Sequence, residues 1–510
     1  MTIRSLPLAV LLADIATPLG ARAHADCFAE RVTIDSRKVE SGTVFVACRG
    51  ATRHSSDGHD FVQQALAQGA CALVVQDPHR VPSTCTIPVF VAPDSRVAAA
   101  LLAERLCGNP SRELQLLGVT GTNGKSTVTF LIADLLNAMA RPCAVFGTLG
   151  VGRRDTLRPL GYTTPEAEIT SAVLAELIEQ GMGAVAMEVS SHALATERVA
   201  GLHFRVAAFT NLSQDHLDFH GDMDSYFAAK TRLFQERLHP DGRIVLPDDG
   251  SIWSQRLREM FPDALLWGAS TSAHAQVLHQ ELHGHGMRLQ LSLLGERTEV
   301  SLSLLGQPNV DNVLCAAACG LALGYSPQEV GDVLPALRPV SGRFQPVPAT
   351  RPAEQPAVVV DYAHTPDALA RLLVAARTLS SGRVIVVFGC GGDRDRQKRA
   401  LMAAAATESA DAVILTNDNP RSESPETILD EIERGVAFGW QRVTEFMAEK
   451  RTYMRMPDRA RAIATAIHAA ASDDIVVIAG KGHEKTQIIG DMILEFDDLL
   501  VAREIMEGLA

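Results

Sequence analysis

Apolar stretches of strand length alternate with helix-like patterns through the middle of the chain. Residues 114–119, 184–189 and 206–209 are almost continuously hydrophobic, which is typical of strands buried on both faces. After the first of them, residues 128–139 carry apolar side chains every three or four positions, the spacing of an amphipathic helix. This alternation predicts an α/β fold with a parallel, doubly wound sheet.

The same rhythm occurs on both sides of this central region. Upstream, short β-rich runs at residues 44–47, 71–75 and 87–92 predict a small α/β unit. Downstream the α/β pattern restarts, with expected strands at residues 357–360, 384–388, 412–416 and 475–479. We therefore expect three domains, at residues 1–113, 114–343 and 344–510.

Two local patterns lie near the end of the expected central domain. Residues 287–294 and 298–305 alternate polar and apolar positions around Gly295-Glu296, which predicts an antiparallel hairpin added to that domain. Four prolines between residues 346 and 356 form a polar, stiff segment, as expected of a linker between domains.

The composition is that of an ordinary globular protein. Of the 510 residues, 46% are hydrophobic and 21% are charged, and the formal net charge is −13. An acidic chain argues against nucleic acid as a partner, although it permits local basic pockets for anionic ligands. The nine cysteines are scattered singly, which favours reduced thiols in a cytoplasmic protein.

A glycine-rich turn stands between the strand at 114–119 and the helix that follows it. Residues 121–127 read G-T-N-G-K-S-T. The general P-loop pattern G-x-x-x-x-G-K-[ST] does not match, because Val119 stands where that pattern has glycine, but the narrower pattern G-T-N-G-K-[ST] does. Backbone N–H groups of such a turn wrap a polyphosphate, and the helix N-terminus adds partial positive charge. Lys125 supplies a full charge and Ser126 can bind Mg²⁺, so the turn predicts nucleotide triphosphate chemistry.

Polar side chains follow the next two expected strands. Glu188 and Ser190 come at the end of 184–189, and His216 follows 206–209. Ligands bind beyond the carboxyl ends of strands in open α/β sheets, so Glu188 and His216 could reach Mg²⁺ held by ATP phosphates. Each residue alone would be read as a helix cap or a surface group. Lys230 lies in a helix-like stretch, where spacing alone indicates a solvated charge.

The first 25 residues partly resemble a secretory signal. An apolar run at residues 6–12 precedes the A-R-A-H-A stretch at 21–25, which looks like a cleavage site. Asp14 and two prolines interrupt the apolar pattern, and an ATP-dependent enzyme would lack ATP outside the cell. We therefore expect a packed N-terminal helix and loop. No stretch approaches the roughly 20 apolar residues that a membrane-spanning helix needs.

Taken together, the motifs resemble those of the Mur ligase family, ATP-dependent enzymes that form amide bonds in peptidoglycan precursors. They run in family order from about residue 34 to 487 and include GTNGKST at 121–127, YTTP at 162–165, MEVSSH at 187–192, TNLSQDHLDFH at 210–220, YFAAKTRLF at 226–234, GQPNVDN at 306–312, SGR at 341–343, DYAHTP at 361–366, GDR at 392–394, DNPR at 418–421 and GKGHE at 480–484. DNPR resembles the branch that adds meso-2,6-diaminopimelate, since the lysine-adding branch usually lacks this arginine.

The resemblance implies a three-domain architecture with a central doubly wound P-loop ATPase domain and a Rossmann-like C-terminal domain. It also implies the substrates UDP-N-acetylmuramoyl-L-Ala-D-Glu, meso-diaminopimelate and ATP, which react through an acyl phosphate. Mg²⁺ is the implied cofactor, and Lys230 matches a lysine that CO₂ converts to a carbamate. We expect a monomer with no nucleic-acid partner and no membrane span.

The implied site residues fall into four sets. The catalytic set is Lys125, Glu188, His216 and Lys230, and the metal set is Ser126, Glu188, His216 and carbamylated Lys230. The ATP set is Gly121, Thr122, Asn123, Gly124, Lys125, Ser126, Thr127, Asn309, Asn312, Arg343 and Asp361. The UDP-substrate set is Ile34, Ser36, Tyr162, Thr163, Thr164, Ser190, Thr196 and Arg198. The diaminopimelate set is Arg394, Asp418, Asn419, Pro420, Arg421, Gly480 and Glu484.

Other interpretations remain open from the sequence. A lysine-adding Mur ligase differs in its amino-acid pocket, and folylpolyglutamate synthetase shares the GTNGKS turn and also joins an amine to an activated carboxylate. A non-catalytic nucleotide-binding protein could keep the fold, although the intact catalytic set speaks against it. Histidines at 274, 279, 283 and 285 could store metal, but solvated loop histidines are the simpler interpretation.

Overall fold

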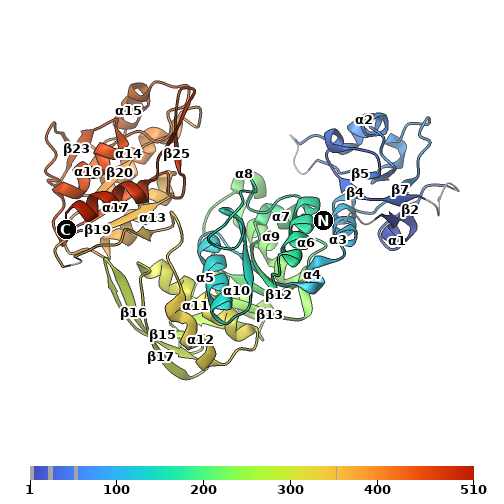
Figure 1. Ribbon diagram of the computed structural model, residues 1–510, viewed down its shortest axis with the longest axis horizontal. Coiled ribbons are helices and arrows are strands. Elements are labelled where there is room, and N and C mark those ends of the chain that lie inside the picture. The colour runs from blue at the N-terminus through green and yellow to red at the C-terminus, as the bar shows by residue number, and fades with distance from the viewer. Residues whose placement is uncertain (1–4, 21–26, 51–54, 352, 510) are drawn as a thin grey trace. The chain divides into compact units, whose positions relative to one another are not determined.

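The computed structural model describes residues 5–20, 27–50, 55–351 and 353–509 (Figure 1). Tertiary contacts divide the chain into two compact units. One unit is Met1–Gln276 with Leu314–Val333, and the other is Val277–Val313 with Leu334–Ala510. The domain boundaries at 113/114 and 343/344 stay predictions.

The first unit begins with a five-stranded sheet in the order β2-β7-β6-β5-β4. Its strands are β2 (Thr17–Pro18), β4 (Arg31–Thr33), β5 (Thr43–Ala47), β6 (Ala72–Val75) and β7 (Val89–Val91). All pairs are parallel except β2 with β7. Successive strand residues such as Val44 and Phe45 point to opposite faces of the sheet and belong to different hydrophobic clusters. Apolar packing therefore covers both faces of this small α/β sheet.

The helices of this region are α1 (Leu8–Leu12), α2 (Val62–Ala67), α3 (Ser95–Leu106) and α4 (Pro110–Glu113), with β1 (Leu6–Pro7) paired to β3 (Phe28–Ala29). Helix α1 buries Leu8, Leu11 and Leu12 in the same cluster as α3, which confirms the expected packed N-terminal helix. The possible cleavage site at residues 21–25 lies outside the described residues.

The first seven strands of the ten-stranded central sheet run in the order β10-β9-β11-β8-β12-β13-β14. These strands are β8 (Gln115–Thr120), β9 (Cys143–Gly147), β10 (Gly150–Gly152), β11 (Ala184–Glu188), β12 (Phe204–Phe209), β13 (Leu238–Asp248) and β14 (Leu265–Gly268). Every neighbouring pair is parallel except β9 with β10. The expected parallel strands are therefore confirmed, and β8 lies between β11 and β12 at the centre.

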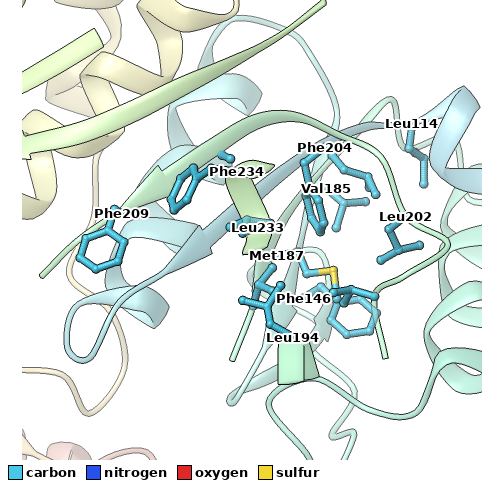
Figure 2. Packing of buried hydrophobic residues seen from close by; sticks show 14 of the residues in the cluster. Leu114, Phe146, Val185, Met187, Leu194, Leu202, Phe204, Phe209, Leu233 and Phe234 are labelled. Atoms are coloured by element: carbon cyan, nitrogen blue, oxygen red, sulfur yellow. The ribbon is translucent and has the colours of Figure 1, made fainter. Parts of the chain in front are cut away.

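Helices on both sides of this sheet make it doubly wound. They are α5 (Lys125–Ala138), α6 (Ala167–Glu179), α7 (Ser191–Ala195), α8 (Leu217–His220), α9 (Met223–Glu236) and α10 (Ile252–Met260). Figure 2 shows the cluster on one face, where Phe146, Val185 and Met187 of the sheet meet Leu233 and Phe234 of α9. Helix α5 packs against β8, β9 and β11.

The second unit contains a hairpin and a seven-stranded sheet. The hairpin pairs β16 (Gly286–Leu293) with β17 (Glu296–Leu302) in antiparallel register, which confirms the predicted hairpin. Tertiary contacts group it with the second unit, so its assignment to the central domain is not confirmed. The sheet order is β18-β19-β24-β20-β21-β23-β22. Its strands are β18 (Gln345–Pro346), β19 (Ala357–Asp361), β20 (Val384–Phe388), β21 (Ala412–Leu415), β22 (Gln441–Arg442), β23 (Thr452–Arg455) and β24 (Ile475–Ala479).

Successive residues of these strands pack on opposite faces. Val386 and Val477 join a cluster with α13 (Pro366–Arg377), α14 (Gln397–Ser409) and α15 (Pro425–Glu433), whereas Ile385 joins a cluster with α16 (Arg459–Ala469) and α17 (Asp498–Gly508). This is the pattern of a Rossmann-like layered domain. The remaining α-helices and β-strands of the described residues, in either unit, are β15 (Ala275–His283), α11 (Gln307–Ala322), α12 (Pro327–Val333) and the hairpin β25 (Thr486–Ile489) with β26 (Met492–Glu495).

The proline-rich segment at residues 346–356 is more than a linker, which corrects the sequence interpretation. It starts in β18, which pairs antiparallel with β19 at the edge of the sheet. Val347 is buried, and Gln355 Nε2 donates a hydrogen bond to the carbonyl of Met506 at 2.7 Å. Proline is tolerated there because an edge strand leaves one side of its backbone unpaired. Among the described residues, no helix is both long and apolar enough to cross a membrane.

Candidate functional site

The glycine-rich turn at 121–127 connects β8 to α5, as the sequence predicts. Gly121 and Gly124 have φ of 142° and 83°, values that favour glycine, and a Cβ at Gly121 would overlap Thr210 Oγ1. Lys125 begins α5, and its Nζ donates to the carbonyls of Gly121 at 3.0 Å and Thr122 at 2.8 Å. The lysine is thus held over the turn that would wrap a polyphosphate.

The end of β12 holds the turn in place. Thr122 N donates to the Asn211 carbonyl at 2.8 Å, and Asn123 N donates to Asn211 Oδ1 at 3.0 Å. Thr210 Oγ1 donates to the Asn123 carbonyl at 2.6 Å. Ser126 and Thr127 follow in the first turn of α5 and are buried. The sequence motif contained Thr210 and Asn211, but their role in holding the turn was missed.

Glu188 ends β11, next to the P-loop strand, and is 1% exposed. Its Oε1 accepts a hydrogen bond from Thr148 N at 2.9 Å and its Oε2 accepts one from Thr148 Oγ1 at 3.1 Å. A Cβ at Gly147 would overlap the carboxylate, so glycine is required for this close approach. Thr148 stood in no motif, and the sequence held no signal for its contact with Glu188.

Lys230 is buried, in contrast to the solvated charge that its spacing alone indicated. It is 1% exposed on α9, and its Nζ donates to the Gly121 carbonyl at 2.7 Å and lies 4.5 Å from the centre of the Tyr226 ring. Burial, together with the positive charge of Lys125, holds the pKa of Lys230 well below its ordinary value of 10.5. The structure therefore places two lysines on the carbonyl of the same loop residue.

His216 lies in a histidine cluster beside Tyr226. Its ring centre is 4.8 Å from that of His192, and His192 is 5.5 Å from His220. His220 Nε2 lies 3.0 Å from Ser191 Oγ. Burial lowers the pKa of His220 to about 4, and the neighbouring imidazoles and Lys230 act in the same direction. His216 itself is half-exposed, with φ of 52°, and lies 3.4 Å from the Asp215 carboxylate.

The expected UDP-substrate residues of the central region surround the end of β11. Thr164 Oγ1 donates to the Glu188 carbonyl at 2.9 Å and accepts from Ser190 N at 3.2 Å. Arg198 Nη1 donates to the Thr164 carbonyl at 3.0 Å, and Arg198 pairs with Glu166 at 2.8 Å. Thr164, Ser190 and Arg198 therefore form one connected group with Glu188.

The other members of this set are more dispersed. Thr163 Oγ1 is 2.9 Å from Thr148 Oγ1, whereas Tyr162 is 66% exposed and Thr196 Oγ1 donates to the His192 carbonyl at 2.7 Å. Ser36 Oγ donates to Gln64 Oε1 at 2.9 Å in the N-terminal sheet region. Ile34 packs at the edge of the hydrophobic cluster that contains α3.

The second unit brings most of the expected amino-acid set together at the ends of β21 and β24. Asn419 Nδ2 donates to Glu484 Oε2 at 2.8 Å, and Gln487 Nε2 donates to the Asp418 carbonyl at 2.8 Å. A Cβ at Gly480 would lie 2.8 Å from Asp418 Oδ2, and its φ of 116° also favours glycine. Burial raises the pKa of the Asp418 carboxyl.

Arg421 lies beside this group with a left-handed backbone, at φ of 52°. Its N donates to the Ile488 carbonyl at 3.0 Å, and its Nη1 donates to the Gly392 carbonyl at 2.8 Å. The side chain of Arg394 is exposed, and its Cγ would lie 3.7 Å from a Cβ at Gly391. Pro420 is buried, and its carbonyl occupies the space that a Cβ at Gly392 would need.

The remaining residues of the expected ATP set also lie in the second unit. Asn312 Nδ2 donates to Asn309 Oδ1 at 3.0 Å, and Asn309 Nδ2 donates to the Leu305 carbonyl at 2.9 Å. Asp361 accepts from Phe344 N and Ala363 N, both at 2.7 Å, and burial raises its pKa.

Arg343 stacks near Tyr362, with its guanidinium 5.3 Å from the ring centre. Its Nε is buried and makes no hydrogen bond within the described part of the chain. Arg343 is therefore an aromatic-backed cation with an unused donor, the kind of group that binds an anionic or polar ligand atom.

Two buried cations beneath the amino-acid set were missed as site residues. Lys481 is 0% exposed and contacts both Asn419 and Glu484. Arg459, in α16, forms a fully buried pair with Asp498 and donates to the carbonyls that precede Asp418 and Gly480. Lys481 lay inside the GKGHE motif, whereas Arg459 lay in no motif.

The structure also bears on the reactivity of Cys390 and on metal binding. Cys390 is buried, and burial raises the pKa of its thiol to about 12, which leaves it protonated and unreactive at neutral pH. Within the described ranges, no three His, Cys, Asp or Glu side chains gather in a way that could hold a metal ion by themselves. Metal at the P-loop would therefore need additional ligands from a nucleotide or a modified side chain.

Comparison with known proteins places these features in a family. Three family models match successive parts of the chain: the Mur ligase family catalytic domain over residues 29–105, the Mur ligase middle domain over 119–320, and the Mur ligase glutamate ligase domain over 342–482.

Individual relatives match nearly the whole chain. The UDP-N-acetylmuramoyl-L-alanyl-D-glutamate–2,6-diaminopimelate ligase of Alkalilimnicola ehrlichii is 42% identical over 480 residues, 92% of each chain. The enzyme of the same name from Xanthomonas oryzae pv. oryzae is 41% identical over 512 residues, 99% of this chain and 98% of its own. A solved structure of an enzyme of that name has a TM-score of 0.72 at 31% identity and covers 99% of both chains. These matches show that the chain belongs to the Mur ligase family.

Proposed function

We propose that this protein is an ATP-dependent ligase that adds meso-2,6-diaminopimelate to UDP-N-acetylmuramoyl-L-Ala-D-Glu in peptidoglycan precursor synthesis. The observation that carries the proposal is the group of Asp418, Asn419, Arg421 and Glu484 in a chain 41% identical, over 99% of its length, to a ligase of that name. Asp418 and Glu484 are carboxylates that suit ammonium groups, and Arg421 is a cation that suits a carboxylate.

Arg421 is the proposed basis of amino-acid choice. Diaminopimelate differs from lysine by a second carboxylate at its far end, which a guanidinium can bind through two parallel hydrogen bonds. A lysine substrate would leave that arginine without its anionic partner, a loss on the order of 3–5 kcal/mol where the charge is buried. Arg421 is partly buried, so the lower end of that range is the better guide.

The proposed reaction has two steps. The D-glutamate carboxylate attacks the γ-phosphorus of ATP, the bond to the leaving oxygen breaks, and an acyl phosphate and ADP form. One amine of diaminopimelate then attacks the acyl carbon, loses a proton and expels phosphate. Lys125 and the N-terminus of α5 would neutralise the phosphate charge as it moves. Asn309, Asn312, Arg343 and Asp361 are the proposed ATP residues of the second unit.

The donors at the P-loop fit Mg²⁺. Ser126, Glu188 and His216, with Lys230 as a carbamate, would hold it, and Mg²⁺ when bound supplies positive charge to the phosphates. The carbamate would form when the neutral Lys230 amine attacks CO₂, making an N–C bond, breaking one C–O π bond and releasing one proton from that nitrogen. This places an anion beside Lys125, at a position where a second ammonium group would be a like-charge contact. ATP as a substrate, a cytoplasmic location and a monomeric state complete the proposal.

A phosphate-release assay tests the function. The chain is supplied with ATP, Mg²⁺, UDP-N-acetylmuramoyl-L-Ala-D-Glu, and either meso-diaminopimelate or L-lysine. We expect phosphate release with diaminopimelate and none with lysine. Arg421→Ala should then reduce the preference for diaminopimelate over lysine at least tenfold. Preference for lysine would keep the ligase activity but refute the role of Arg421. No release with either amino acid would refute the proposed function.

A further inference from the structure

Lys481 is a buried lysine whose three donors are all used within the amino-acid group. It is 0% exposed, and its Nζ lies 2.6 Å from the Thr486 carbonyl, 3.2 Å from Glu484 Oε2 and 3.3 Å from Asn419 Oδ1. An ammonium group carries three N–H bonds and no acceptor, so these partners account for all of them. Lys481 therefore has no donor left to offer a substrate, and its effect must pass through its neighbours.

The neighbour that matters is the carboxylate of Glu484. Its Oε2 receives both hydrogen bonds that the described residues make to it, one from Lys481 and one from Asn419 Nδ2 at 2.8 Å. Asn419 is held in turn, since its Oδ1 also accepts Ile488 N at 3.0 Å. With Oε2 occupied on both sides, the carboxylate has one orientation, and Oε1 is the oxygen left for a ligand.

We propose that Lys481 is a positioning residue that presents Glu484 Oε1 to the distal ammonium of the diamino acid. The inference rests on the proposed function. It extends that function to Lys481, which belongs to none of the implied site sets and has no donor free to contact a ligand. A carboxylate tied by one oxygen to a buried cation pays little reorganisation cost when the other oxygen binds an ammonium group. Removal of Lys481 leaves Glu484 held by Asn419 alone. The carboxylate is then less firmly oriented, which weakens binding of the diamino acid but not of ATP.

A double-mutant cycle separates this role from simple support of the fold. Lys481→Met and Glu484→Gln are made singly and together, and the KM values for diaminopimelate and ATP are measured by phosphate release. We expect Lys481→Met to raise the KM for diaminopimelate about tenfold in the wild-type background and less than twofold in the Glu484→Gln background. The KM for ATP should change less than twofold. Arg503→Gln, which removes an exposed ion pair on α17, is the matched control.

The outcomes distinguish the two proposals. Wild-type turnover with diaminopimelate, together with an equal rise in KM in both backgrounds, would overturn the positioning role and assign Lys481 to holding the Thr486 carbonyl of β25. Absence of wild-type turnover would overturn the proposed function and this inference with it. If Lys481→Met fails to fold, Lys481→Gln, which keeps two N–H donors but no charge, is carried through the same cycle. The same dependence on Glu484 is expected, and its absence would refute the proposal.

Discussion

Replacing Asp498 with asparagine should destabilise the second unit, because it leaves the Arg459 charge buried without a counterion. Both side chains are 0% exposed, and Asp498 accepts from Arg459 Nε at 2.7 Å and Nη2 at 2.6 Å. Asparagine keeps the shape but turns an NH₂ group towards a guanidinium that can only donate. Breaking such a pair costs about 3–5 kcal/mol, which for a unit of this size lowers the melting temperature by roughly 6–20 °C.

The assay is differential scanning calorimetry of the full chain, in which the transition of the second unit is followed. Arg503→Gln is a control for loss of an ion pair as such, since exposed pairs contribute at most about 1 kcal/mol. The double variant Arg459→Met with Asp498→Leu removes both charges and should recover most of the lost stability. Such a recovery would show that Asp498→Asn is destabilised by an uncompensated charge and not by a cavity.

The Asp498→Asn variant should also affect amino-acid binding. Arg459 also donates to the carbonyls of Asn417 at 3.2 Å and Ala479 at 3.1 Å, the residues that precede Asp418 and Gly480. We expect Asp498→Asn to raise the KM for diaminopimelate at temperatures where it is folded. Two results would refute the reasoning. One is a decrease in melting temperature of less than 2 °C for Asp498→Asn. The other is a double variant, Arg459→Met with Asp498→Leu, that is less stable than Asp498→Asn.

Three further predictions concern the first unit. Lys230→Ala should nearly abolish phosphate release, and added bicarbonate should not restore it; near-normal activity would refute the carbamate role. Gly121→Ala should raise the KM for ATP at least tenfold, because its Cβ would overlap Thr210 Oγ1, and unchanged ATP kinetics would contradict this. The folded pKa of His220, about 4, is below its ordinary value of 6.5, so only the unfolded chain binds its proton between these values. Stability should therefore fall as pH drops from 6.5 to 4, and His220→Gln should flatten that slope in urea titrations.

Local features of the fold were predictable from the sequence because they depend on neighbouring residues. The P-loop at 121–127 joins a strand and a helix that are each recognisable by period, and the β16–β17 hairpin has both strands and its Leu294-Gly295 turn in one stretch. The strand role of residues 345–346 was not predictable, since it depends on pairing with β19, which is separated from it by the proline-rich segment.

The burial of Lys230 had a sequence signal that its helical context obscured. Tyr226 and Phe234 stand four residues on either side of it, and all three are buried on α9. Residues spaced by four share one face of a helix, so Lys230 lies on the apolar stripe of its helix. The contact between Thr148 and Glu188 had no such signal, because it joins the ends of two neighbouring parallel strands that are 40 residues apart.

The amino-acid group shows why motifs alone understate a site. A ligand with two ammonium groups needs carboxylates, yet buried carboxylates are unstable without positive charge nearby. Here Arg459 lies among the charges that lower the pKa of Asp418 against the effect of burial, and Lys481 pairs with Glu484 at 3.2 Å. Each cation makes its hydrogen bonds to protein acceptors, so the carboxylates are stabilised without closing the oxygens that a substrate would use. A motif names the residues at the surface of such a group, whereas the cations beneath it come from wherever the fold can bury a charge.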